Sequence, residues 1–309
     1  MVADKMQLSK LVDMEHPQSV LDEVRTIVFT IFPEFDFEPV QRVFGDMVRL
    51  FRGEYPGYRK CNTEYHDLKH TTDVILAMIR LIDGAIVQRE TLCQKYVSLG
   101  LLSTLFHDTG YIQTSDEDSG TGAKYTLVHI SRSIEFMDKY FINHRLTGKR
   151  FSREDLENCG HILHCTGFSI NIHEVPFKTR EIELLGKMLG TADLLGQMAD
   201  RTYLEKLLFL FYEFREGHVG GYTSELDLLR NTLGFYDMMR RRLACELGGV
   251  HEYMIHHFKK RWNIDRDLYE DAIENNREYL KYILENYERE HRDHLKRGGI
   301  VAKLDGAGQ

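Results

Sequence analysis

The chain of 309 residues has little of what defines several other classes of protein. Its five cysteines are odd in number and form no CxxC pair, which argues against a disulfide scaffold or a zinc ribbon and for a reducing cytoplasm. The longest nearly apolar stretch covers only residues 97–106, whereas a membrane span needs about 20 residues. The N-terminus has neither the basic start nor the apolar segment of a signal peptide. We therefore expect a cytoplasmic protein without a membrane partner.

The chain also lacks positive charge and proline. It has 40 Lys and Arg against 48 Asp and Glu, a net charge of -8, which argues against a nucleic-acid partner bound through bulk charge. Only five prolines interrupt it, so long helices can form. Hydrophobic residues make up 42%, enough for a full core. This composition predicts a globular protein and leaves a homo-oligomer open.

Apolar residues recur at the three- and four-residue spacing of a buried helix face. The clearest run consists of Val40, Val43, Phe44, Met47, Val48 and Phe51. The spacing returns within residues 127–141, 204–211 and 226–236, and no alternating run predicts a strand. The sequence predicts an all-α protein with an N-terminal helical extension (1–38), a main domain (39–245) and a C-terminal helical extension (246–309). The charged segment 265–297 reads as one long terminal helix.

The placement of the 15 histidines points to chemistry. His66 and His70 share a face if their segment is helical, and His107-Asp108 ends an apolar helix just before a polar loop. Asp193 lies in another apolar helix, where an unpaired charge costs several kcal/mol. A metal ion would remove that cost, and imidazole with carboxylate suits Zn, Fe, Mn or Ni. A helix cap or an ion pair is the alternative role for Asp193.

In this order, the residues resemble the H…HD…D signature of the HD-domain metal-dependent phosphohydrolases. The closer likeness, over roughly residues 40–245, is to the catalytic domain of the class I cyclic-nucleotide phosphodiesterases. Residues 65–74 (YHDLKHTTDV) resemble that family's YHNxxHxxDV, and Glu213-Phe214 resembles the start of its EFFxQGD. Residues 231–237 (NTLGFYD) resemble its SQVGFxDY, which supplies a purine-binding glutamine and a stacking phenylalanine. The resemblance implies a phosphodiesterase-like HD helical bundle.

The resemblance also implies roles for individual residues. His66 would be the general acid, and one or two divalent ions (Fe, Mn, Zn, Mg or Ni) would bind the metal ligands His70, His107, Asp108 and Asp193. Phe235 would stack on a base, whereas Thr232 replaces the family's glutamine and cannot make its bidentate amide contact.

The sequence after the HD pair, Thr-Gly-Tyr at 109–111, is more similar to bacterial HD proteins such as the HD-GYP group. Dinuclear members of that kind place two further histidines before the last aspartate. The candidates here are His129 and His164, with His161 as the substitute for His164. A structural core histidine is the alternative at each position.

These features predict a metal-dependent phosphohydrolase, of the phosphodiesterase or nucleotidase type, acting on a small phosphoester that is most simply a nucleotide. Hydrolysis of another phosphate monoester is the second choice. A non-catalytic or weakly catalytic HD module that binds a nucleotide for signalling is the alternative from a different class, although the intact motif favours an enzyme. Charged surroundings predict solvated surface for the histidines at 256 and 257 and the arginines at 240–242.

Overall fold

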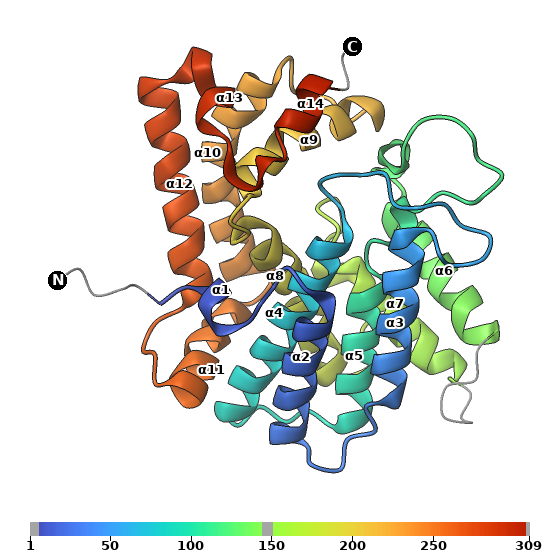
Figure 1. The fold of residues 1–309 in the computed structure, drawn as a ribbon. Helices are drawn as coiled ribbons and strands as arrows, with labels where there is room; N and C mark the ends of the chain where they lie inside the picture. The colour runs from blue at the N-terminus through green and yellow to red at the C-terminus, as the bar shows by residue number, and fades with distance from the viewer. Residues whose placement is uncertain (1–5, 144–150, 307–309) are drawn as a thin grey trace.

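The structure is a computed structural model that describes residues 6–143 and 151–306 (Figure 1). The described residues form helices and loops and contain no β-strand, only an isolated antiparallel bridge between Tyr58 and Thr114. The prediction of an all-α fold is confirmed. No helix in these two ranges is both long enough and apolar enough to cross a membrane.

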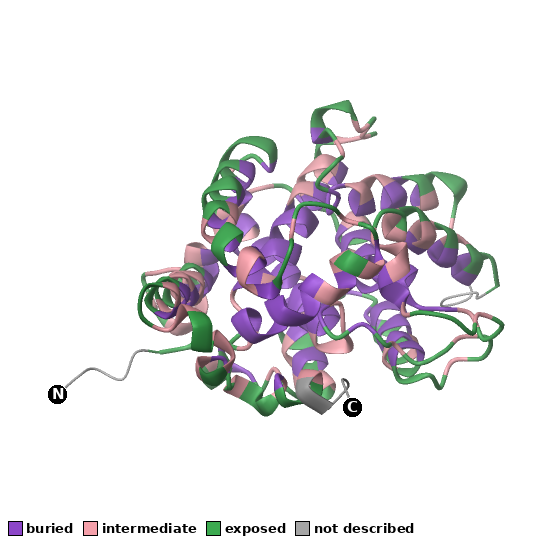
Figure 2. Ribbon diagram, turned by 90° about the horizontal axis from the view of Figure 1, so that it is seen from above, coloured by how far each residue is buried: buried purple, intermediate pink, exposed green. Residues whose placement is uncertain are grey.

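The centre of the bundle is α4 (Leu68–Val87), which is buried along almost its whole length. Buried segments fill the middle of the molecule, and exposed segments lie at its rim (Figure 2). Its residues 74–82 are apolar on every side except for Arg80, so neighbouring helices must surround it. The helices α2 (Pro17–Ile31), α5 (Gln94–Phe106), α8 (Arg180–Met198) and α11 (Tyr253–Trp262) do so. Gly84 permits the approach of α11, because a Cβ at this position would overlap the Tyr253 carbonyl.

Two cores hold the remaining helices. The first includes α3 (Glu38–Arg52), α6 (His129–Asn143) and α7 (Arg153–His164) around α5. The second lies between α9 (Tyr203–Glu216), α10 (Glu225–Arg241) and α12 (Leu268–Asn286). The shorter helices are α1 (Leu8–Leu11), α13 (His291–His294) and α14 (Ala302–Gly306). The second core continues into the C-terminal end of α8, so α8 joins the two.

Both terminal segments contribute to these cores. Val20 and Val24 of α2 belong to the first core, and Leu295 and Val301 belong to the second. The expectation of one helix over 265–297 is wrong: α12 ends at Asn286, and the chain turns before α13. The turn lets the following segment fold back, so that Leu295 is fully buried.

Two expectations of solvated surface are also wrong. His257 is fully buried, with its Nδ1 2.6 Å from Asp83 Oδ2. Arg242 is 5% exposed and donates hydrogen bonds to the carbonyls of Cys165 and Gly167. In each case a distant element supplies the partner that makes burial of a polar side chain tolerable.

Candidate metal centre and active site

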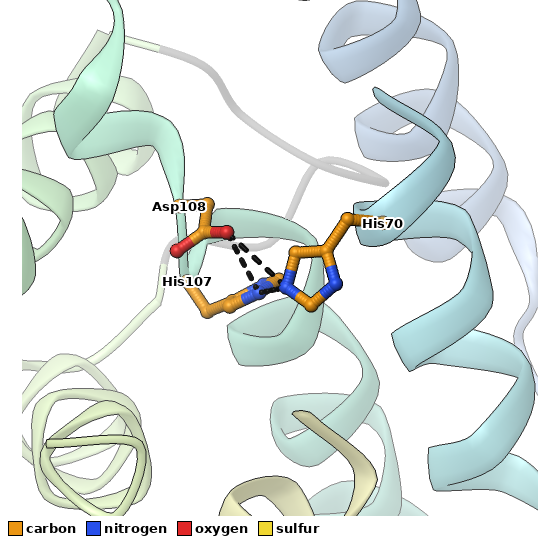
Figure 3. A group of neighbouring side chains, drawn as sticks. All are labelled: His70, His107 and Asp108. Carbon is orange, nitrogen blue, oxygen red and sulfur yellow. Dashed lines mark hydrogen bonds and ion pairs between the residues drawn. The ribbon is translucent and has the colours of Figure 1, made fainter. Parts of the chain in front are cut away.

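The four residues of the H…HD…D pattern meet where α4, the end of α5 and α8 come together. Figure 3 shows three of them, His70, His107 and Asp108. His70 Nε2 lies 3.1 Å from His107 Nε2, 3.3 Å from Asp108 Oδ2 and 3.1 Å from Asp193 Oδ1. His107 Nε2 lies 3.3 Å from Asp108 Oδ2 and 3.9 Å from Asp193 Oδ1. All four residues are buried. The structure thus gathers His70, His107 and Asp108 into one close group, with Asp193 on the side of His70.

Local hydrogen bonds orient these side chains. Asp67 caps α4 by accepting from the His70 amide at 2.8 Å, which fixes the start of the helix. His107 Nδ1 lies 2.8 Å from the Thr104 carbonyl, and since a carbonyl only accepts, Nδ1 carries the proton there. In the neutral ring the lone pair is then on Nε2, which faces the centre. This is the usual arrangement of a metal-ligating histidine.

The field at the centre favours a cation. Burial lowers the pKa of His70, but Asp108 and Asp193 outweigh it and raise the pKa to about 10. Burial raises the pKa of Asp108, but the imidazoles of His107 and His70 hold it well below its usual range. Asp108 Oδ2 is buried and makes no hydrogen bond of good geometry, although the Nε2 atoms of His70 and His107 each lie 3.3 Å away. The centre thus presents a buried oxygen that a bound cation would satisfy.

The spacing of the four side chains also fits a divalent ion. Ligand atoms about 2.1 Å from an ion, at angles between octahedral and tetrahedral, lie about 3.0–3.4 Å from one another. Of the five distances that involve an imidazole nitrogen, four fall in this range, and the fifth, from His107 Nε2 to Asp193 Oδ1, is 3.9 Å. Mixed nitrogen and oxygen ligands suit Zn, Fe, Mn or Ni. His70, His107, Asp108 and Asp193 could therefore hold one ion.

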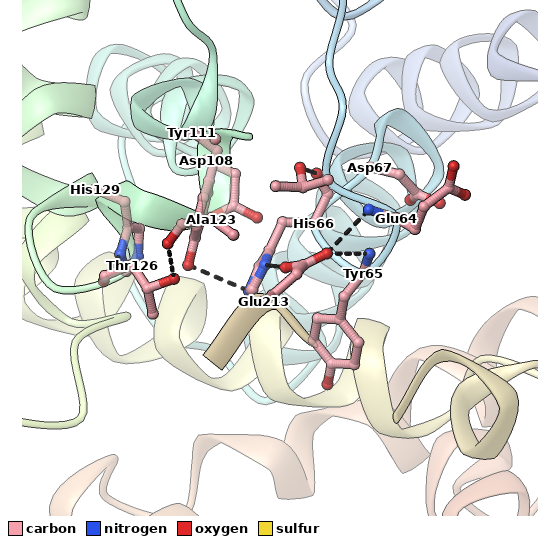
Figure 4. A network of polar contacts seen from close by, with 12 residues as sticks. Glu64, Tyr65, His66, Asp67, Asp108, Tyr111, Ala123, Thr126, His129 and Glu213 are labelled. Carbon is pink, nitrogen blue, oxygen red and sulfur yellow. Dashed lines mark hydrogen bonds and ion pairs between the residues drawn. The ribbon is translucent and has the colours of Figure 1, made fainter. Parts of the chain in front are cut away.

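His66 lies beside the centre and is tied to Glu213 of α9 (Figure 4). Its Nδ1 is 2.8 Å from Glu213 Oε2, and its ring centroid is 6.3 Å from that of His70. Glu213 Oε1 accepts the backbone amides of Glu64 and Tyr65 at 2.9 and 2.8 Å. Three hydrogen bonds therefore fix this buried carboxylate and, through it, the His66 ring. In the sequence, only its place in the EFFxQGD-like segment distinguishes Glu213, and that resemblance implies no role for it.

Tyr111 forms the middle of a stack of three rings. Its ring is 4.2 Å from that of His66 at 14° and 4.7 Å from that of His129 at 20°. Its hydroxyl lies 3.4 Å from His66 Nε2. His129 Nδ1 lies 2.7 Å from the Thr126 carbonyl, which it can only contact as a donor. The structure thus brings His129 beside the site, with Tyr111 between it and His66.

The structure does not gather His164 or His161 into the centre. Within the described ranges, neither has a hydrogen bond, ion pair or ring contact with the four central residues. His164 ends α7, and burial lowers its pKa. The ring of His161 lies against Phe177, at 6.2 Å between centroids. A second ion coordinated by His164 remains a prediction without a geometric basis here.

The predicted base-binding residues lie on α10. Thr232 is buried, and its hydroxyl donates to the Leu228 carbonyl of the same helix at 2.9 Å. The half-buried Phe235 ring lies 6.0 Å from the ring of Phe168, which is 54% exposed. The Arg242 guanidinium lies 4.9 Å from the Phe168 ring centroid. Phe235 and Phe168 therefore form an accessible aromatic pair, whereas the Thr232 hydroxyl already donates its hydrogen bond within α10.

The fold and the site together define an all-α protein with a buried cluster of histidines and aspartates. A family model described as Npun_R2479-like matches residues 57–243, more than half of the chain. The chain therefore belongs to the Npun_R2479-like family. The matched range includes every predicted site residue, from His66 to Phe235. No curated protein and no solved structure matches the chain.

Proposed function

We propose that this protein is a metal-dependent phosphohydrolase of the HD type that hydrolyses a phosphoester of a nucleotide. The observation that carries the proposal is the convergence of His70 from α4, the adjacent His107 and Asp108 from the turn after α5, and Asp193 from α8 at one buried site. Burying two carboxylates at one site is costly unless a cation compensates them. A divalent ion bound there would activate a water molecule and neutralise charge on the phosphoryl oxygens.

His66 supplies the proton for the leaving oxygen in this proposal. Its Nδ1 faces a carboxylate, which stabilises the protonated imidazole and orients the ring. The other nitrogen, Nε2, lies on the side of Tyr111, whose stacked ring limits rotation of the imidazole. Glu213 and Tyr111 are therefore positioning residues for the acid.

The aromatic pair formed by Phe235, on α10, and Phe168, in the loop after α7, supports a nucleotide as the substrate. Phe168 is largely exposed beside Phe235, and stacking of a base on an aromatic ring contributes about 1–3 kcal/mol. Because the Thr232 hydroxyl is engaged within its helix, we expect base recognition by stacking rather than by an amide contact. Selectivity between bases should therefore be weak.

The first test is metal analysis of the purified protein, followed by turnover assays. Protein stripped with a chelator is reloaded with Mn, Mg, Fe, Zn or Ni and assayed for phosphoester cleavage in cyclic and linear nucleotides. We expect one tightly bound ion per chain and turnover of at least one nucleotide. Metal and nucleotide binding without turnover of any ester would favour the non-catalytic signalling module, and absence of metal binding would refute both.

The second test addresses the acid. His66→Ala should keep its metal, while turnover of a nucleotide ester falls by about 10²–10⁴-fold. A nitrophenyl ester has a good leaving group and should lose much less. Equal losses on both esters would contradict the acid role, and loss of metal would make His66 a ligand or a scaffold residue.

A further inference from the structure

A cavity of about 510 Å³ lies between α3, α6 and the loop after α3, and none of the four central residues lines it. This volume lies within the range of small-molecule sites, about 300–1,000 Å³. A second cavity of equal volume shares Arg42, Asp46 and Arg49 with it, so the arginines form a ridge between two hollows. The first cavity, lined in part by Tyr55, Tyr58 and Phe136, is called the α3 pocket below.

Three aromatic rings make one wall of the α3 pocket. Tyr58 meets Phe136 edge to face at 5.1 Å, and Tyr55 lies 6.0 Å from Tyr58 and 6.2 Å from Phe136. Phe136 is 8% exposed and rests on Phe106 at 6.1 Å, so the wall is backed by the core. Rings that are held in this way lose little entropy when a planar ligand packs on them.

The charges around the α3 pocket are mainly positive. Its lining includes three cationic side chains, those of Arg42, Arg49 and Lys139, and a single carboxylate, that of Asp46. The chain as a whole has a net charge of -8. Asp46 is engaged, because it accepts from the Tyr140 hydroxyl at 2.6 Å and pairs with Arg49 at 3.3 Å. The Arg49 side chain is 50% exposed, and an exposed ion pair contributes little free energy. Arg49 can therefore exchange Asp46 for an anionic ligand at little cost.

We propose that the α3 pocket binds a small anion that carries a planar aromatic ring, with a nucleoside monophosphate as its simplest form. The ring would pack on Tyr55 and Tyr58, and the phosphate would meet Arg49 and Lys139. Guanidinium groups pair well with phosphate, and aromatic rings accept any base. This site does not depend on the proposed hydrolase activity, because it uses none of the residues assigned to that activity.

The test measures binding of three probes to the full chain by calorimetry, in excess chelator. The probes are AMP, adenosine, which lacks the charge, and ribose 5-phosphate, which lacks the ring. AMP should bind at least about tenfold more tightly than either fragment. Arg49→Glu should weaken AMP by about tenfold or more and leave adenosine unchanged. Tyr58→Leu, which keeps an apolar contact with Phe136, should weaken both ring-bearing probes.

Arg52→Glu is the matched control, since it makes the same charge change on the same helix outside the α3 pocket. It should leave AMP binding unchanged, and Lys139→Glu replaces Arg49→Glu if the latter lowers the melting temperature. Absence of AMP binding would overturn the proposal. Equal losses of AMP affinity in Arg49→Glu and Arg52→Glu would also overturn it. The same holds if Asp108→Ala abolishes AMP binding and Arg49→Glu does not.

Discussion

Replacing Glu213 with glutamine removes one charge while keeping the shape of the side chain. The backbone amides of Glu64 and Tyr65 both donate to Glu213 and cannot donate to an NH₂ group. The side-chain oxygen of the new glutamine must therefore stay beside these two amides. Its NH₂ group then faces His66 Nδ1, where the carboxylate oxygen was at 2.8 Å. Because NH₂ only donates, Nδ1 must accept, and the protonated imidazole is no longer stabilised.

The size of the effect follows from this one contact. A hydrogen bond to a charged group contributes about 1.5–3 kcal/mol, which corresponds to about 10–10²-fold in rate if it acts only on the acid. We expect turnover of a nucleotide ester by Glu213→Gln to fall by at least that factor. Metal content should not change, because Glu213 is not one of the four central residues.

The assay compares kcat for a nucleotide ester and a nitrophenyl ester at saturating metal. The loss should be large for the first and small for the second, since a good leaving group needs little protonation. Glu216→Gln is the control: it lies one turn later on α9 and binds the Thr121 amide and hydroxyl instead of a histidine. The same loss on both esters, or the same profile in Glu216→Gln, would refute the reasoning.

Three further outcomes follow from other parts of the molecule. Asp108→Asn should lose both the bound ion and all turnover, measured by elemental analysis and phosphate release; full metal content in this variant would remove Asp108 from the ligands. Burial lowers the pKa of His257 from 6.5 to about 4, so between these values the unfolded chain binds a proton that the folded chain does not. The free energy of unfolding should therefore fall, by up to about 3 kcal/mol, as pH decreases from about 7 to about 4, and urea denaturation should show a smaller fall in His257→Gln. Gly84→Ala should lower the melting temperature, because its Cβ would overlap the Tyr253 carbonyl, whereas Gly45→Ala in α3, with open space around it, should leave it unchanged or raise it; equal effects would contradict the close approach of α11.

The sequence by itself determined the features that depend on local spacing. The three- and four-residue recurrence of apolar side chains predicts helices, and the structure has them, as in α3, α9 and α10. The pattern within residues 127–141 is the partial exception, because α6 begins at His129 and Leu127 is 73% exposed. The order of His70, His107, Asp108 and Asp193 singled out four residues that the fold brings together. Short-range periodicity is visible in one chain because each helix repeats its own geometry.

Only the tertiary structure decided which distant groups become partners. Glu213 reaches His66 across 147 positions of sequence, and no local pattern in either segment specifies that contact. His257 and Arg242 occur in charged segments, yet Asp83 and the carbonyls of Cys165 and Gly167 make their burial tolerable. Polar burial depends on a partner being within hydrogen-bond distance, and that distance is set by the packing of whole helices rather than by the neighbours in the chain.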